Sequence, residues 1–117
     1  MIITINDMLA VSNFLDKFKD SKMSFKTAFK CNKLANSLKY DMEFFRTKYK
    51  DIVNKYSEET ENGLQIKKEF TNEFNSAANE LATTEIEIDD IYFTIEELAN
   101  CEMTISELRP LMKFIKE

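Results

Sequence analysis

The sequence predicts an α+β fold that is mostly α, with a long helical hairpin and a small sheet. The chain of 117 residues contains one glycine and one proline, so tight turns and helix breaks must be few. Between residues 28 and 56 apolar residues recur at alternating spacings of three and four, as in a helix that packs lengthwise against another. From residue 84 the apolar spacing changes to two, which is typical of a strand.

The composition indicates one domain, residues 1–117. The chain has the usual length of a single domain, and its 44% hydrophobic residues include ten Phe and four Tyr, enough for a core. Near the start the longest uncharged apolar run covers only residues 8–11, too short for a bilayer. We therefore expect a cytoplasmic protein without membrane contact.

Cys31 and Cys101 are expected to be buried free thiols, with a disulfide between them as the alternative.

The first twenty residues predict a short strand and a helix. Ile2–Ile5 favour a strand because β-branched residues suit a pleated sheet. Asn6 or Asp7 can then cap a helix that runs to about Phe18.

From Ser24, a good N-cap, to about Tyr56, one helix of about 50 Å is expected. Its spacing defines an apolar seam, the predicted contact with a second helix or with another copy of the chain. The seam consists of Ala28, Cys31, Ala35, Leu38, Met42, Phe45, Tyr49, Ile52 and Tyr56.

The second half of the chain predicts a return helix, a strand and two short helices. A polar turn at 57–65 contains Asn62-Gly63, and a helix over 67–82 completes the hairpin. A strand within 84–93 pairs with the N-terminus, giving two or three strands. Capping boxes at Thr94/Glu97 and Thr104/Glu107 begin two short helices, and Pro110 gives the second a bend or a late start.

Several classes of chemistry are excluded. The chain has no histidine, which removes the commonest general base and the nucleophile pairs that depend on it. Two distant cysteines cannot complete a zinc site, and a single glycine rules out the common phosphate-binding loops. We expect no cofactor and no catalytic residue. Asp89, Asp90, Glu96 and Glu97 could hold a metal ion or hydrolyse a glycoside, but a solvated acidic face is the simpler interpretation.

Charge is distributed unevenly along the chain. Residues 69–108 contain eleven acids and no basic residue, whereas residues 17–55 contain eleven basic residues and four acids. The predicted acidic face consists of Glu85, Glu87, Asp89, Asp90, Glu96 and Glu97. A basic stripe consists of Lys22, Lys26, Lys30 and Lys33. The two charged regions neutralise each other within the fold, or one of them binds a partner.

A second apolar surface lies outside the seam. Phe29, Tyr40 and Phe44 occupy other faces of the long helix, so one partner helix cannot cover them. The first helix and the sheet cover them within the monomer, or they form an interface with another protein.

Short polar signatures recur through the last two thirds of the chain, in the order Tyr56-Ser57-Glu58-Glu59, Glu61-Asn62-Gly63, Phe74-Asn75, Asn79-Glu80-Leu81, Glu85-Ile86-Glu87-Ile88-Asp89, Ile105-Ser106 and Leu108-Arg109-Pro110-Leu111. In this layout the chain resembles an uncharacterised family of small proteins encoded by tailed phages of low-GC Gram-positive bacteria. The chain departs from the family at Glu107, where a proline usually follows the Ile-Ser pair. The resemblance implies a phage protein in the host cytoplasm and assigns no functional residue.

The sequence therefore favours a non-enzymatic phage accessory protein that acts by binding a host or phage protein and can form a homodimer. One alternative is an inhibitor of a host defence or nucleic-acid enzyme, of the anti-CRISPR or another anti-defence type, whose acidic face imitates nucleic acid. A second alternative is nucleic-acid binding through the basic stripe, although the overall acidic balance argues against it.

Overall fold

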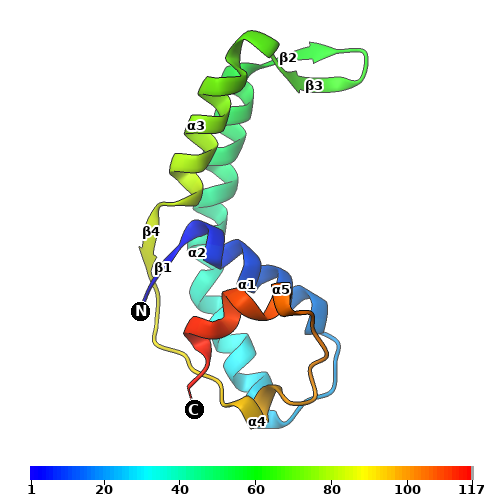
Figure 1. Cartoon of the computed structure of the whole chain (residues 1–117), viewed down its shortest axis with the longest axis vertical. Coiled ribbons are helices and arrows are strands. Elements are labelled where there is room, and N and C mark those ends of the chain that lie inside the picture. The colour runs from blue at the N-terminus through cyan, green and yellow to red at the C-terminus, as the bar shows by residue number, and fades with distance from the viewer. Residues whose placement is uncertain (117) are drawn as a thin grey trace.

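One helix organises the molecule, as the long run without glycine or proline predicted. In the computed structural model, which describes residues 1–116, α2 spans Phe25–Tyr56 and extends through most of the height of the molecule (Figure 1). Ser24 caps it by accepting a hydrogen bond from the Thr27 amide at 3.2 Å. The fold class is α+β and mostly α, as predicted.

The N-terminal strand and helix follow each other without a loop. β1 spans Ile2–Thr4 and α1 spans Ile5–Phe18. The cap of α1 is Thr4, not Asn6 or Asp7, so the helix begins earlier than the sequence predicted. Thr4 accepts from the Asp7 amide at 3.1 Å, and the Asp7 carboxylate accepts from the Thr4 amide at 3.2 Å. This reciprocal pair satisfies two backbone donors at the helix start.

The predicted pairing of the N-terminus with the later strand is confirmed. β4, Glu85–Glu87, runs antiparallel to β1 with Ile3 opposite Ile86. The expected extent of 84–93 was too long, because β1 offers only three residues for pairing before α1 begins. Further along, Phe93 forms an isolated parallel bridge with Ile115.

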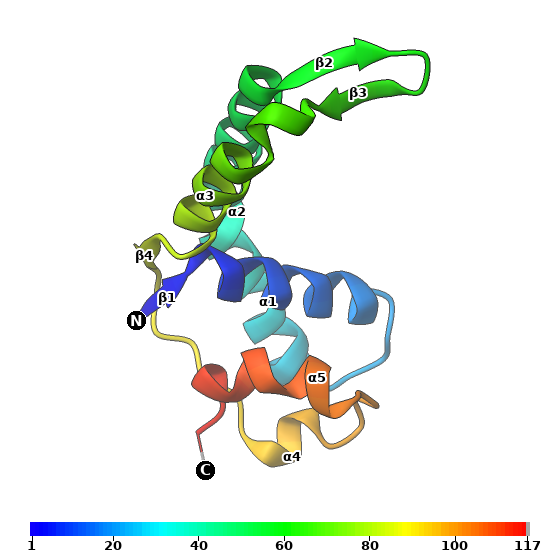
Figure 2. The same ribbon diagram turned by 45° about the horizontal axis from the view of Figure 1, so that its top comes forward.

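The reversal at Asn62-Gly63 is confirmed, but it takes the form of a β-hairpin. β2, Ser57–Thr60, pairs antiparallel with β3, Gly63–Ile66, and Gly63 has a φ of 93°, which glycine adopts without steric cost. The sequence did not indicate these strands because the segment is polar. Figure 2 shows the hairpin projecting from the end of α2.

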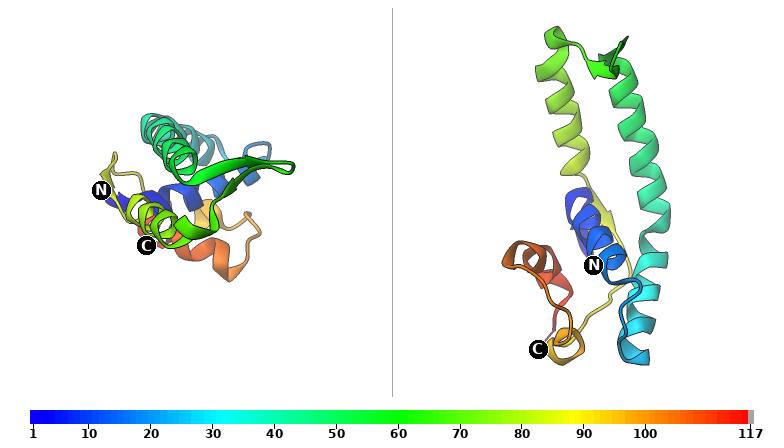
Figure 3. Two further views of the ribbon diagram at one scale, coloured as in Figure 1. Left: turned by 90° about the horizontal axis from the view of Figure 1, so that it is seen from above. Right: turned by 90° about the vertical axis from the view of Figure 1, so that its right-hand side faces the viewer.

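The return helix is shorter than predicted. A 3-10 turn, η1 at Lys68–Phe70, precedes α3, Thr71–Ala82. α3 lies beside the second half of α2 (Figure 3), which confirms the helical hairpin.

The chain closes with the two predicted short helices. α4 spans Ile95–Leu98 and α5 spans Ile105–Leu108, and both capping boxes are present. A 3-10 helix, η2 at Arg109–Phe114, then contains Pro110. The change of helix type replaces the predicted bend, because proline has no amide hydrogen to donate.

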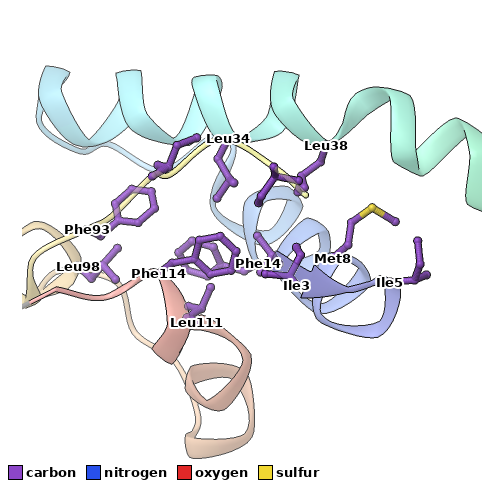
Figure 4. Packing of buried hydrophobic residues seen from close by; sticks show 13 residues of the cluster. Ile3, Ile5, Met8, Phe14, Leu34, Leu38, Phe93, Leu98, Leu111 and Phe114 are labelled. Atoms are coloured by element: carbon purple, nitrogen blue, oxygen red, sulfur yellow. The ribbon is translucent and has the colours of Figure 1, made fainter. Parts of the chain in front are cut away.

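The core lies entirely in one part of the molecule. We call residues 1–38 and 85–116 the base, and residues 39–84 the stalk. Leu34 and Leu38 of α2 point into a cluster with Phe14, Phe93 and Phe114 (Figure 4). No residue of the stalk is fully buried. The radius of gyration is 17.0 Å, against about 13 Å for a compact domain of this length, so the stalk makes the molecule elongated.

Candidate interaction surface

Four aromatic side chains lie along the outer face of α2, and we call them the outer aromatic row. Phe25, Phe29, Tyr40 and Phe44 expose 84%, 59%, 77% and 42% of their surface. Their spacings of four, eleven and four residues keep them on one side of the helix over about 28 Å. The rings of Phe25 and Phe29 have centroids 6.1 Å apart.

The row is exposed because α2 forms one edge of the molecule. In the right-hand view of Figure 3, α1, α3 and the C-terminal helices all lie on the other side of α2. That side supplies the fully buried positions of the helix, Thr27, Leu34 and Leu38. Of the two explanations for Phe29, Tyr40 and Phe44, burial by the first helix and the sheet is therefore wrong.

Phe25 belongs to the row but was absent from the predicted second surface. It is the first residue of α2, four positions before Phe29. Because residues four apart share a helix face, this spacing and the predicted N-cap at Ser24 could together have placed Phe25 there from the sequence.

The basic stripe is divided in the structure. Lys26 and Lys33 are exposed on the same side of α2 as the outer aromatic row, whereas Lys22 precedes the helix. Lys30 turns towards the C-terminal segment, where its Nζ donates to Glu97 Oε1 at 2.7 Å. Two lysines of the basic stripe, Lys26 and Lys33, therefore remain available beside the row.

The Lys30–Glu97 pair is largely buried, with the side chains 25% and 10% exposed. Glu97 Oε1 also accepts from the Thr94 amide at 3.0 Å. The hydrogen bond from Lys30 lowers the pKa of Glu97, while burial partly opposes this. The Lys30 ammonium lies 5.9 Å from the centroid of the Phe93 ring. The pair thus links α2 to α4 over the core.

The predicted acidic face is not one continuous surface. Glu85 and Glu87 are exposed on β4, and Asp89 and Glu96 are exposed beyond it. Asp90 forms an ion pair with the amino group of Met1, and Glu97 forms one with Lys30. Lys17 pairs with Glu107 at 2.6 Å. Two ion pairs therefore join the basic segment to the acidic segment and neutralise part of the charge asymmetry.

The apolar seam follows its predicted face in the stalk and at Leu38, but not at Ala28 and Ala35. In the stalk, Phe45, Ile52 and Tyr56 are half-buried, whereas Tyr49 is 41% exposed. In the base, Ala28 and Ala35 are exposed, and Thr27 and Leu34 occupy the buried positions beside them. Leu34 is larger than Ala35 and buries more apolar area. Burial of the helix face that carries Thr27 and Leu34 is therefore favoured over burial of the predicted face.

A pocket lies where the small seam residues face α1. It has a volume of about 230 Å³ and an apolar lining. The lining residues are Phe14, Leu15, Phe18, Lys19, Ser21, Met23, Ala28, Cys31, Asn32 and Ala35.

Both cysteines are free and half-buried. Burial raises the pKa of the Cys31 thiol, with a smaller contribution from Cys101, and burial raises that of Cys101. Both are therefore protonated at neutral pH.

Within residues 1–116, Cys, Asp and Glu side chains form no group of three or more that could hold a metal ion. None of the helices in the part of the chain that the structure describes is both long and apolar enough to cross a bilayer.

Comparison of the chain with models of protein families, with curated proteins and with solved structures found no match in any of the three. The interpretation of the surface therefore depends on its own residues.

Proposed function

We propose that this protein is a non-enzymatic interaction protein that binds another protein through the outer aromatic row. The exposure of four aromatic side chains on one helix face supports this proposal. Large aromatic residues contribute much of the binding energy of protein interfaces, and their exposure in two pairs on one helix face is unusual for a side of a protein that has no partner.

The charges beside the row indicate the chemistry of the partner. Lys26 and Lys33 flank Phe29 on the exposed side of α2. A complementary surface would offer an apolar groove for the rings and acidic side chains at its rim. The resemblance noted in the sequence supports the further proposal that the protein is a phage accessory protein acting in the host cytoplasm.

The proposal predicts that the row contributes to binding and not to folding. Phe29→Ser and Tyr40→Ser should change the free energy of unfolding by at most about 0.5 kcal/mol, because both side chains are exposed. Each should weaken binding to the partner about 30-fold, the effect of losing an interface hot spot.

A photo-crosslinking residue at Tyr40 would capture the partner in cells, and calorimetry with the purified partner would measure the affinities. The matched control is Asn13, an exposed position on α1, which lies on the other side of α2 from the row, as crosslinker and as Asn13→Ser. Equal affinity of the row variants and the wild type would contradict the proposal, as would capture from Asn13 alone.

An inhibitor that imitates nucleic acid is the second candidate. The observation in its favour is that Glu85 and Glu87 are exposed on β4 and have no ion-pair partner within the described chain. Glu85→Lys with Glu87→Lys should then abolish binding to the captured partner and leave Phe29→Ser without effect. The opposite pattern supports the aromatic row.

A further inference from the structure

The stalk is a pair of helices that cannot bury its own apolar residues. Tyr49 contacts Phe74 with ring centroids 6.3 Å apart, and Tyr56 contacts Phe70 at 5.8 Å. All apolar residues on the facing sides of the two helices nevertheless remain partly exposed. They are Phe45, Tyr49, Ile52, Val53, Tyr56, Phe70, Phe74, Ala77, Ala78 and Leu81. Two amphipathic helices leave one side of their shared apolar face open, and bundles close it with two more helices.

The charged side chains of the stalk are not paired with one another. Each ion pair found among residues 1–116 joins two residues of the base. The stalk part of α2 carries five basic and three acidic side chains, whereas α3 carries two acidic side chains, Glu73 and Glu80, and no basic one. Arg46 and Lys50, and likewise Glu73 and Glu80, share a helix edge because they are four and seven residues apart.

The open face is large enough for a specific contact. The stalk part of α2 is about 27 Å long, and two packed helices are about 20 Å wide. The projected area is then about 500 Å² on each molecule. The two molecules together would bury about 1,000 Å², which is close to the lower limit for a specific interface.

We infer that a second copy of the chain covers this face, with α2 of each copy beside α3 of the other in a four-helix bundle. A second copy supplies both an apolar cover for the open face and complementary charges at its edges. Its acidic α3 meets the basic α2, and the same contact recurs across the two-fold axis. An unrelated partner would need a basic and an acidic strip in the same arrangement. The outer aromatic row faces the opposite side and stays free in the dimer.

Sedimentation equilibrium of the full chain, from micromolar to millimolar concentration, tests this inference. The expected result is a monomer–dimer equilibrium that reaches twice the chain mass of 13.8 kDa. A monomer throughout this range would overturn the inference, and the proposal for the outer aromatic row would be unaffected.

Charge reversal identifies the surface. Arg46→Glu with Lys50→Glu, and separately Glu73→Lys with Glu80→Lys, should each raise the dissociation constant of the dimer at least about tenfold, because like charges then face each other. The two pairs of reversals combined should restore dimerisation. Because the two variants change different helices, loss of folding in one leaves the other as a test, with circular dichroism as the check.

The matched control is Glu96→Lys with Glu102→Lys, two exposed positions of the base that change the net charge as much as the α3 variant does. It should leave the dissociation constant unchanged. A dimer that tolerates the stalk reversals, or that the control weakens equally, would show that association occurs elsewhere.

Discussion

Replacing Leu38 with glutamate should unfold the base of the protein. Leu38 is 1% exposed and lies in the core, where α2 faces Phe14 and Phe93. The change removes a buried leucine, worth about 2 to 5 kcal/mol, and places a carboxylate where it has no partner. The combined loss of about 5 to 10 kcal/mol is comparable to the total stability of a typical small domain, about 5 to 15 kcal/mol. Thermal and urea unfolding followed by circular dichroism would measure it.

Two matched variants separate this effect from a general sensitivity of α2. Ala35→Glu places the same side chain three residues earlier, at an exposed position of the predicted seam, and should change stability by at most about 0.5 kcal/mol. Leu38→Met keeps the volume and should cost less than about 1.5 kcal/mol. A cooperatively folded Leu38→Glu, or an Ala35→Glu that is equally destabilised, would contradict the observed position of the buried face.

Replacing Lys30 with alanine should lower the free energy of unfolding by about 3 kcal/mol at neutral pH, because it leaves the Glu97 carboxylate buried and unpaired. The second oxygen of Glu97 is already buried without a hydrogen-bond partner, so solvent cannot easily replace Lys30. Lys26→Ala is the control, since Lys26 is exposed one turn earlier and should have little effect.

The pH dependence of the Lys30 effect follows from the lowered pKa of Glu97. The group has an ordinary pKa of 4.5 and titrates below this value in the folded protein, so it stabilises the fold fully above pH 4.5. This contribution is lost as the pH falls through the folded pKa. In Lys30→Ala, burial favours the protonated carboxyl, so the difference in stability from the wild type should shrink as the solution becomes acidic.

Urea unfolding of both proteins at a series of pH values would measure this difference. The double change Lys30→Met with Glu97→Gln should recover most of the stability at neutral pH, because it removes both charges and keeps an acceptor for the Thr94 amide. A difference between Lys30→Ala and wild type that grows on acidification would rule out the role assigned to Glu97.

The comparison of sequence and structure is most instructive along α2. The alternating spacing correctly predicted a long helix and a helical partner for its second half, where α3 is the neighbour that covers it. In the first half the same pattern placed Ala28 and Ala35 on the buried face, and the structure buries Thr27 and Leu34. There α1 and the C-terminal segment pack on α2 from several directions, so a two-helix pattern does not determine the buried face.

The sequence by itself determined the local elements: the cap at Ser24, the capping boxes at Thr94 and Thr104 and the reversal at Asn62-Gly63. These depend on short-range hydrogen bonds between residues that are neighbours in the chain. The period of two in the apolar residues also predicted the pairing of β1 with β4, although it joins residues far apart in the sequence. Tertiary structure alone decided that the core occupies one end of the molecule, that Lys30 turns to Glu97, and that the outer aromatic row stays exposed. Each of these depends on which face of α2 its neighbours cover, and that is set by contacts between residues far apart in the sequence.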